Sequence, residues 1–159
     1  MYKYIYFSQY FIIISFLIVG CNLAPPASTE EDETTLNCNT DVCLQLELEN
    51  EKEEIIIRCT NSQEISGFQF YLNNILIEAF ISGRAVEEGF SITNSNITYM
   101  VIGFSLTADF IPSGEGDLLR IKYSEVESLP ICLSEPVFVG TGSSTPSLTV
   151  NTGECIHFN

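Results

Sequence analysis

The sequence contains no tryptophan, a single histidine, and only six basic residues against 21 acidic ones. The resulting net charge of −15 excludes nucleic acid as a partner, because such a surface repels phosphate groups. A catalytic triad needs a histidine oriented beside a nucleophile. Nothing around His157 marks one, since the stretch 140–144 (Gly-Thr-Gly-Ser-Ser) lacks the G-x-S-x-G pattern. We therefore predict that the protein is not an enzyme.

Motifs for metals and cofactors are also missing. No CxxC pair occurs, which removes the usual zinc motif. The acidic run Glu30–Glu33 lacks the turn glycine of a calcium loop, and Gly114–Gly116 is too short for a phosphate loop. The adjacent acids Glu87 and Glu88 could serve a glycosidase, but we interpret them as a solvated turn. The sequence predicts neither a metal nor a cofactor.

The N-terminus has the pattern of a secretory signal. Lys3 supplies a positive start, and the apolar segment 11–19 follows. The next residues, Ile18-Val19-Gly20-Cys21, resemble the bacterial lipobox. The resemblance implies that the Cys21 thiol receives a diacylglyceryl group and that residues 1–20 are removed. An uncleaved membrane anchor over residues 4–23 is the alternative.

The lipobox resemblance also implies a location. Asn22 follows the cysteine in place of the aspartate that is associated with inner-membrane retention, which favours the outer membrane. We therefore expect a lipid-anchored protein of the cell envelope.

Two parts are expected after the signal. Removing residues 1–20 leaves 139 residues with five bases and 21 acids, a net charge of −16. Residues 21–37 are rich in Pro, Ser, Thr and acidic residues, which favours a flexible tether over a packed structure. Residues 38–159 are enough for one domain of ordinary size.

Five cysteines lie beyond Cys21, and several cysteines in an exported domain indicate disulfides. They are Cys38, Cys43, Cys59, Cys132 and Cys155. The odd number means that two bridges leave one thiol, and the spacing alone does not choose the pairs. We expect a stabilising bridge among Cys59, Cys132 and Cys155, because a bridge from Cys38 to Cys43 closes only a short loop.

The domain has the pattern of an all-β protein. Apolar and polar residues alternate with a period of two in short segments that Gly, Pro, Asn or Ser clusters separate. The expected strands are Leu44–Glu49, Glu54–Cys59, Ile65–Leu72, Ile75–Ile81, Phe90–Thr93, Ile97–Ser105, Asp117–Tyr123, Pro136–Gly140, Ser147–Val150 and Cys155–Phe158. Only Arg84–Glu88 favours a helical turn. The pattern predicts an antiparallel β-sandwich or jelly roll.

Particular residues are expected to shape the sandwich. Phe68, Phe70, Phe90 and Phe104 are predicted to fill the space between the sheets. The glycines at 67 and 103 are expected to permit close backbone approach or a bulge.

Four of these segments resemble cohesin domains, and they occur in that family's order over roughly residues 64–125. They are Gly67-Phe68-Gln69-Phe70, the stretch from Ser82 to Phe90, Val101 to Ser105, and the I-P-x-G-x-G-x-L-like stretch from Ile111 to Leu119. The resemblance implies a jelly-roll sandwich of about nine strands, related to carbohydrate-binding modules. It also implies a dockerin-like protein partner.

Function is expected to be binding. We predict a module for protein–protein contact at the envelope, with a carbohydrate-binding module of the same architecture as the alternative. Tyr71, Tyr99 and Tyr123 are the candidate aromatics for a polysaccharide, although they can equally rim the core with their hydroxyls in water. A structural envelope lipoprotein without a discrete ligand is the third interpretation.

Overall fold

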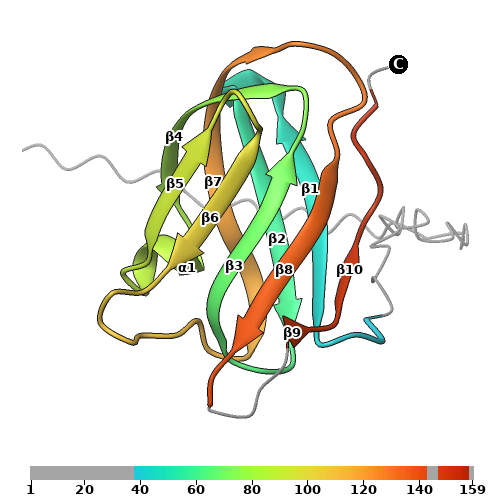
Figure 1. The fold of residues 1–159 in the computed structure, drawn as a ribbon. Coiled ribbons are helices and arrows are strands. Elements are labelled where there is room, and N and C mark those ends of the chain that lie inside the picture. The colour runs from blue at the N-terminus through green and yellow to red at the C-terminus, as the bar shows by residue number, and fades with distance from the viewer. Residues whose placement is uncertain (1–37, 143–146, 158–159) are drawn as a thin grey trace, which may run out of the picture. The chain divides into compact units, whose positions relative to one another are not determined.

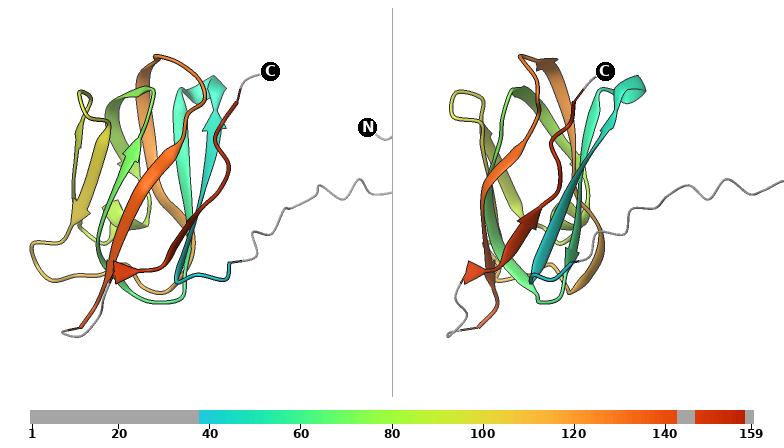
Figure 2. Two further views of the ribbon diagram at one scale, coloured as in Figure 1. Left: turned by 45° about the vertical axis from the view of Figure 1, so that its right-hand side comes forward. Right: turned by 90° about the vertical axis from the view of Figure 1, so that its right-hand side faces the viewer.

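The computed structural model describes residues 38–142 and 147–157, which form a sandwich of two five-stranded sheets (Figures 1 and 2). The predicted signal sequence and tether, with Cys21, lie outside the described residues. Sheet A contains β1 (Val42–Glu49), β2 (Glu54–Asn61), β4 (Ile75–Ser82), β7 (Gly114–Val126) and β10 (Val150–Thr152). Sheet B contains β3 (Ile65–Leu72), β5 (Ser91–Ser95), β6 (Met100–Phe104), β8 (Leu133–Gly140) and β9 (Ser147–Leu148).

The strand order is β10-β1-β2-β7-β4 in sheet A and β5-β6-β3-β8-β9 in sheet B. Every pair of neighbours is antiparallel except β1 and β10, which run parallel. A short 3-10 helix (Asn50–Lys52) joins β1 to β2, and the helical turn α1 (Arg84–Glu87) follows β4. The predicted all-β sandwich and the predicted helical turn are both confirmed.

The C-terminal segment differs from the sequence-based expectation. The predicted strand at 147–150 divides at Thr149, so that β9 pairs with β8 in sheet B and β10 pairs with β1 in sheet A. The predicted strand at 155–158 is wrong over the described residues, where only an isolated bridge joins Ile156 to Ile131. Local periodicity does not reveal this path, because the pairing partners lie far away in the sequence.

We call residues 147–157 the C-terminal clasp, because they cross from one sheet to the other along the side of the sandwich (Figure 2). Asp41 fastens the clasp: its Oδ2 accepts hydrogen bonds from the Thr149 backbone N–H (2.9 Å) and hydroxyl (2.7 Å). Together with a bond from Gln63, these donors lower the pKa of the Asp41 carboxyl below its usual value. Farther along, the Gly153 N–H donates to the Leu44 carbonyl.

Two disulfides are present in the described residues. Cys38–Cys43 closes a short loop at the start of β1, and Cys132–Cys155 joins the start of β8 to the clasp. The expected bridge among Cys59, Cys132 and Cys155 is therefore found, and Cys59 is the thiol left over. Burial raises the pKa of Cys59 to about 12, which keeps this thiol protonated and unreactive at neutral pH.

The core is built around stacked phenylalanines. The Phe68 ring lies 5.7 Å from Phe70, 6.1 Å from Phe90 and 5.6 Å from Phe138, measured between ring centroids. All four side chains are buried. The Phe68 ring needs a glycine opposite it, because a Cβ on Gly103 would lie 2.1 Å from Phe68 Cζ. The prediction for Gly103 is close backbone approach or a bulge, whereas the structure places a side-chain ring against it. The irregularity expected at Gly67 is found in the pairing of β3 with β8, where the register shifts between Ile65 and Gly67.

Phe104 is not in the core, which corrects the prediction for this residue. Its side chain is 40% exposed, and it lies on the outer face of sheet B. Side chains alternate along β6, so the inward position of Gly103 forces Phe104 outward.

Candidate functional site

The outer face of sheet B carries no charged side chain at its paired strand positions, and we call it the neutral face. Glu135, exposed at an unpaired position of β8, is the one charged residue in the five described strands of this sheet. The residues of the neutral face alternate with inward-facing neighbours, which are buried on β3, β6, β8 and β9 and half-buried on β5. They are Ser91, Thr93 and Ser95 on β5, Met100, Ile102 and Phe104 on β6, Gly67, Gln69 and Tyr71 on β3, Val137 and Val139 on β8, and Ser147 on β9.

Strand register gathers the apolar members at the centre of this face. Phe104 and Val139 are both paired with Gly67, so they flank it on either side. In the next row, Ile102 and Val137 flank Gln69. Because Gly67 has no side chain, β3 places none between Phe104 and Val139 in this row.

The exposed fractions show that these side chains are presented to solvent. Val137 is 44% exposed and Val139 is 42% exposed, close to the value for Phe104. Contiguous exposed apolar surface is unfavourable in water, and on soluble proteins it marks contact sites. The neutral face can therefore desolvate against another apolar surface.

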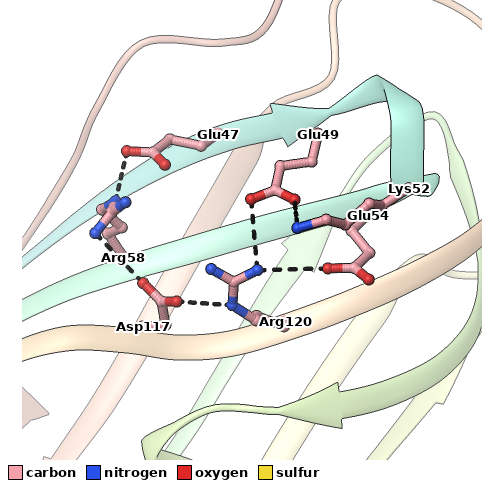
Figure 3. Close-up of polar contacts among 7 residues, drawn as sticks. All are labelled: Glu47, Glu49, Lys52, Glu54, Arg58, Asp117 and Arg120. Atoms are coloured by element: carbon pink, nitrogen blue, oxygen red, sulfur yellow. Dashed lines mark hydrogen bonds and ion pairs between the residues drawn. The ribbon is translucent and has the colours of Figure 1, made fainter. Parts of the chain in front are cut away.

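The outer face of sheet A has the opposite character (Figure 3). A network of ion pairs there joins Glu47, Glu49, Glu54, Arg58, Asp117 and Arg120 with Lys52 of the adjoining 3-10 helix, and a further pair joins Lys122 to Glu78. Arg58 Nε donates to Glu47 Oε1 (2.5 Å), and Arg120 Nε donates to Asp117 Oδ2 (2.9 Å). These acceptors raise the pKa of both arginines above the usual value. Exposed ion pairs each stabilise little, so we interpret this face as a solvated surface.

A partly buried polar cluster around Asn61 and Arg84 includes the stretch that resembles the cohesin turn. Arg84 donates from Nη1 to Asn61 Oδ1 (2.8 Å) and from Nη2 to the Pro112 carbonyl. Asn61 Nδ2 donates to the carbonyls of Pro112 (2.8 Å) and Gln63 (2.7 Å). Gly116 leaves space for the arginine, since a Cβ there would lie 3.1 Å from Arg84 Cδ. The cluster ties the connection before β7 to α1 and the end of β2, which is a structural role.

The three candidate tyrosines do not form a row. Tyr71 lies on the neutral face, whereas Tyr123 on β7 packs partly against the core. Tyr99 lies in the turn between β5 and β6, where its hydroxyl donates to Glu127 Oε2 (2.5 Å). A flat sugar-stacking platform needs aligned rings, and this placement does not supply one from these residues.

The other sequence candidates are dispersed. His157 is exposed at the end of the clasp, whereas Glu87 is exposed at the end of α1 and Glu88 beside it is half-buried. Within residues 38–142 and 147–157, no group of three or more His, Cys, Asp or Glu side chains could hold a metal ion. No helix in the same residues is long and apolar enough to cross a membrane.

The sequence reasoning missed the neutral face, although a signal was present. Residues 100–104 (Met-Val-Ile-Gly-Phe) and 137–139 (Val-Phe-Val) are apolar at both alternating sets of positions. Such strands are expected where both faces of a sheet are covered. In this structure only one face of sheet B is covered by sheet A, so the other apolar set stays exposed.

Comparison of the chain with known protein families, with characterised proteins and with solved structures finds no match.

Proposed function

We propose that the chain is a lipid-anchored binding module that contacts a protein partner at the cell envelope through the neutral face. One observation carries the proposal: a chain with 21 acidic residues keeps charge off the paired strand positions of one sheet face and places apolar side chains at its centre. Keeping those side chains exposed is costly unless a partner covers them.

The charge of the chain restricts the partner. A net charge of −15 repels acidic proteins and attracts basic ones over several ångströms. The partner therefore presents an apolar centre with basic residues around it, since complementary charge speeds association while the apolar contact supplies affinity. A dockerin-like module, which the cohesin resemblance implies, belongs to this class of protein partner.

A protein partner fits the neutral face better than a polysaccharide does. Only Tyr71 and Phe104 are aromatic on this face, and branched or flexible aliphatic side chains fill the rest of its apolar centre. Aliphatic side chains pack well against another protein, whereas sugar rings stack on aligned planar rings.

Photo-crosslinking in the producing cells tests the proposal. A photoreactive amino acid at Val137 on the neutral face is expected to give a discrete adduct with another protein. The same amino acid at Glu47 on sheet A, whose side chain is 43% exposed, is the matched control and is expected to give none. Adding Phe104→Ala to the Val137 probe should lower the adduct yield at least several-fold, because it removes the largest apolar contact.

Three results would contradict this function. Equal adduct yields from the probes at Val137 and Glu47 would show that the crosslinks are non-specific. An adduct yield that Phe104→Ala does not lower would show that the partner does not contact the neutral face. Retention of the purified protein on insoluble polysaccharide, lost on Tyr71→Ala, would favour the carbohydrate-binding alternative.

Lipid anchoring is tested separately, because it rests on Cys21 and the lipobox resemblance. Labelling with a radioactive fatty acid is expected to mark the wild-type protein and to leave Cys21→Ala unlabelled. The wild type should remain in the membrane fraction, since two or more acyl chains hold a protein stably at about 0.8 kcal/mol per buried methylene. An unlabelled wild type that keeps residues 1–20 would support the uncleaved membrane anchor instead.

A further inference from the structure

The sandwich has one long edge strand. A strand at the end of a sheet exposes unpaired N–H and C=O groups, which can add a strand from another chain. The end strands β5, β9 and β10 have five, two and three residues, whereas β4 has eight. Short end strands offer few groups for pairing, so β4 is the end strand that offers the most groups to an added strand.

The composition of β4 adds to the risk of strand addition. Its sequence is Ile-Leu-Ile-Glu-Ala-Phe-Ile-Ser, with neither lysine nor proline, the residues that commonly block an edge. Its single charge, on Glu78, is paired with Lys122 on the neighbouring strand. Ile81 is 45% exposed near the end of the strand. Long apolar edges of this kind are sites of self-association.

A side chain from the other sheet occupies this edge. Asn96, in the turn between β5 and β6, accepts a hydrogen bond from the Ile77 N–H at Oδ1 and donates from Nδ2 to the Ile77 carbonyl, both at 3.1 Å. The carboxamide thus makes the same two bonds with Ile77 that a residue of an added strand would make. Asn94 Nδ2 donates to Asn96 Oδ1 (2.8 Å) and helps to orient the amide.

We propose that Asn96 is an edge guard: its carboxamide occupies the backbone groups of Ile77 and prevents a second copy of this chain from pairing along β4. The inference does not depend on the proposed binding function, because β4 lies in sheet A and the neutral face in sheet B. Asn96-Ile97-Thr98 matches the N-x-Thr pattern of a glycosylation sequon. In the structure the Asn96 amide instead donates one of its N–H groups to the Ile77 carbonyl.

Removing the guard tests the proposal. The full chain is compared in detergent micelles by size-exclusion chromatography with light scattering, in a Cys21→Ala background that prevents intermolecular disulfides. High salt is needed, because it screens the repulsion between two chains of charge −15. The protein with Asn96 is expected to be monomeric, and Asn96→Ala is expected to double its protein mass as concentration rises. Asn96→Asp keeps the acceptor and loses the donor, so a smaller shift toward dimer is expected.

Two further variants locate the association. Ile81→Lys in the Asn96→Ala background should restore the monomer, because a charged side chain on β4 blocks strand addition without restoring the two bonds. Asn73→Ala is the matched control: it removes a bond to the Ser134 hydroxyl and leaves the edge guard intact, so it should stay monomeric.

Amide hydrogen exchange separates the outcomes. One outcome is an Asn96→Ala protein that is folded, exchanges the Ile77 amide faster and still remains monomeric at every concentration. That result would overturn the proposal, because the β4 edge would be unprotected and yet no second copy would pair with it. If Asn96→Ala dimerises and Ile81→Lys does not reverse the dimer, the contact lies away from β4 and the proposal is overturned. A dimer of the protein that retains Asn96 would also overturn the proposal.

Discussion

Phe70→Ala is expected to lower the free energy of unfolding by about 3–5 kcal/mol, the usual cost of deleting a fully buried ring. Phe70 is completely buried and its ring stacks against Phe68. The change leaves a cavity at the centre of the sandwich, where rigid strands on both sides cannot close around it. Urea unfolding followed by circular dichroism measures the loss.

Phe104→Ala provides the control with the same chemical change. Because Phe104 is partly exposed on the neutral face, its loss is expected to cost less than about 1 kcal/mol. The pair thus separates stability from binding, since Phe104→Ala should weaken the partner contact and leave the fold intact. An equal decrease in the free energy of unfolding for the two variants would contradict the assignment of Phe70 to the inner face and Phe104 to the outer face of sheet B.

Removing the Cys132–Cys155 bridge is expected to cost about 3 kcal/mol, from the chain entropy of the loop that it closes. The two residues are 23 apart in the sequence, and the bridge holds the end of the C-terminal clasp against β8. Cys132→Ala with Cys155→Ala removes both sulfurs, so that no new free thiol confuses the result. Thermal and urea unfolding of the doubly substituted protein measure the change.

The other bridge gives the comparison. Cys38 and Cys43 are five apart, and the same relation gives only about 2 kcal/mol for so short a loop. We expect the corresponding double alanine variant to be the more stable of the two. A larger loss at Cys38–Cys43, or no loss at Cys132–Cys155, would show that loop entropy does not set the contribution of these bridges.

Local patterns predicted most of the sandwich. Alternation alone predicts the strand Ile65–Leu72, which is β3 in the structure, and the helical turn predicted at Arg84–Glu88 is α1. The 3-10 helix Asn50–Lys52 is a second short helical segment. These successes share a cause. Where one face of a strand is polar, the period of two fixes which side chains point inward.

Prediction failed where a strand has apolar residues on both of its faces. In residues 100–104 nearly every side chain is apolar, so the period does not say whether Gly103 or Phe104 points inward. An aromatic ring is the more usual core residue. The deciding contact is the Phe68 ring over Gly103, a tertiary interaction that lies between strands.

The candidate site was less predictable than the fold. Tyr71, Tyr99 and Tyr123 were chosen by residue type, but only strand register shows that they lie on different parts of the sandwich. The neutral face depends on the pairing of β6 and β8 with β3, and the edge guard on a side chain that reaches the opposite sheet. Such long-range contacts have no local signature.

The parallel pairing of β1 with β10 has a consequence for the order in which the chain folds. Asp41 and Thr149, which bond beside this pair, are 108 residues apart. During synthesis from the N-terminus, β1 therefore waits with one edge open until nearly the whole domain has emerged, and closing so long a loop is slow. A stop codon before residue 150 would leave Val42, Cys43 and Leu44 of β1 without a strand partner on that edge.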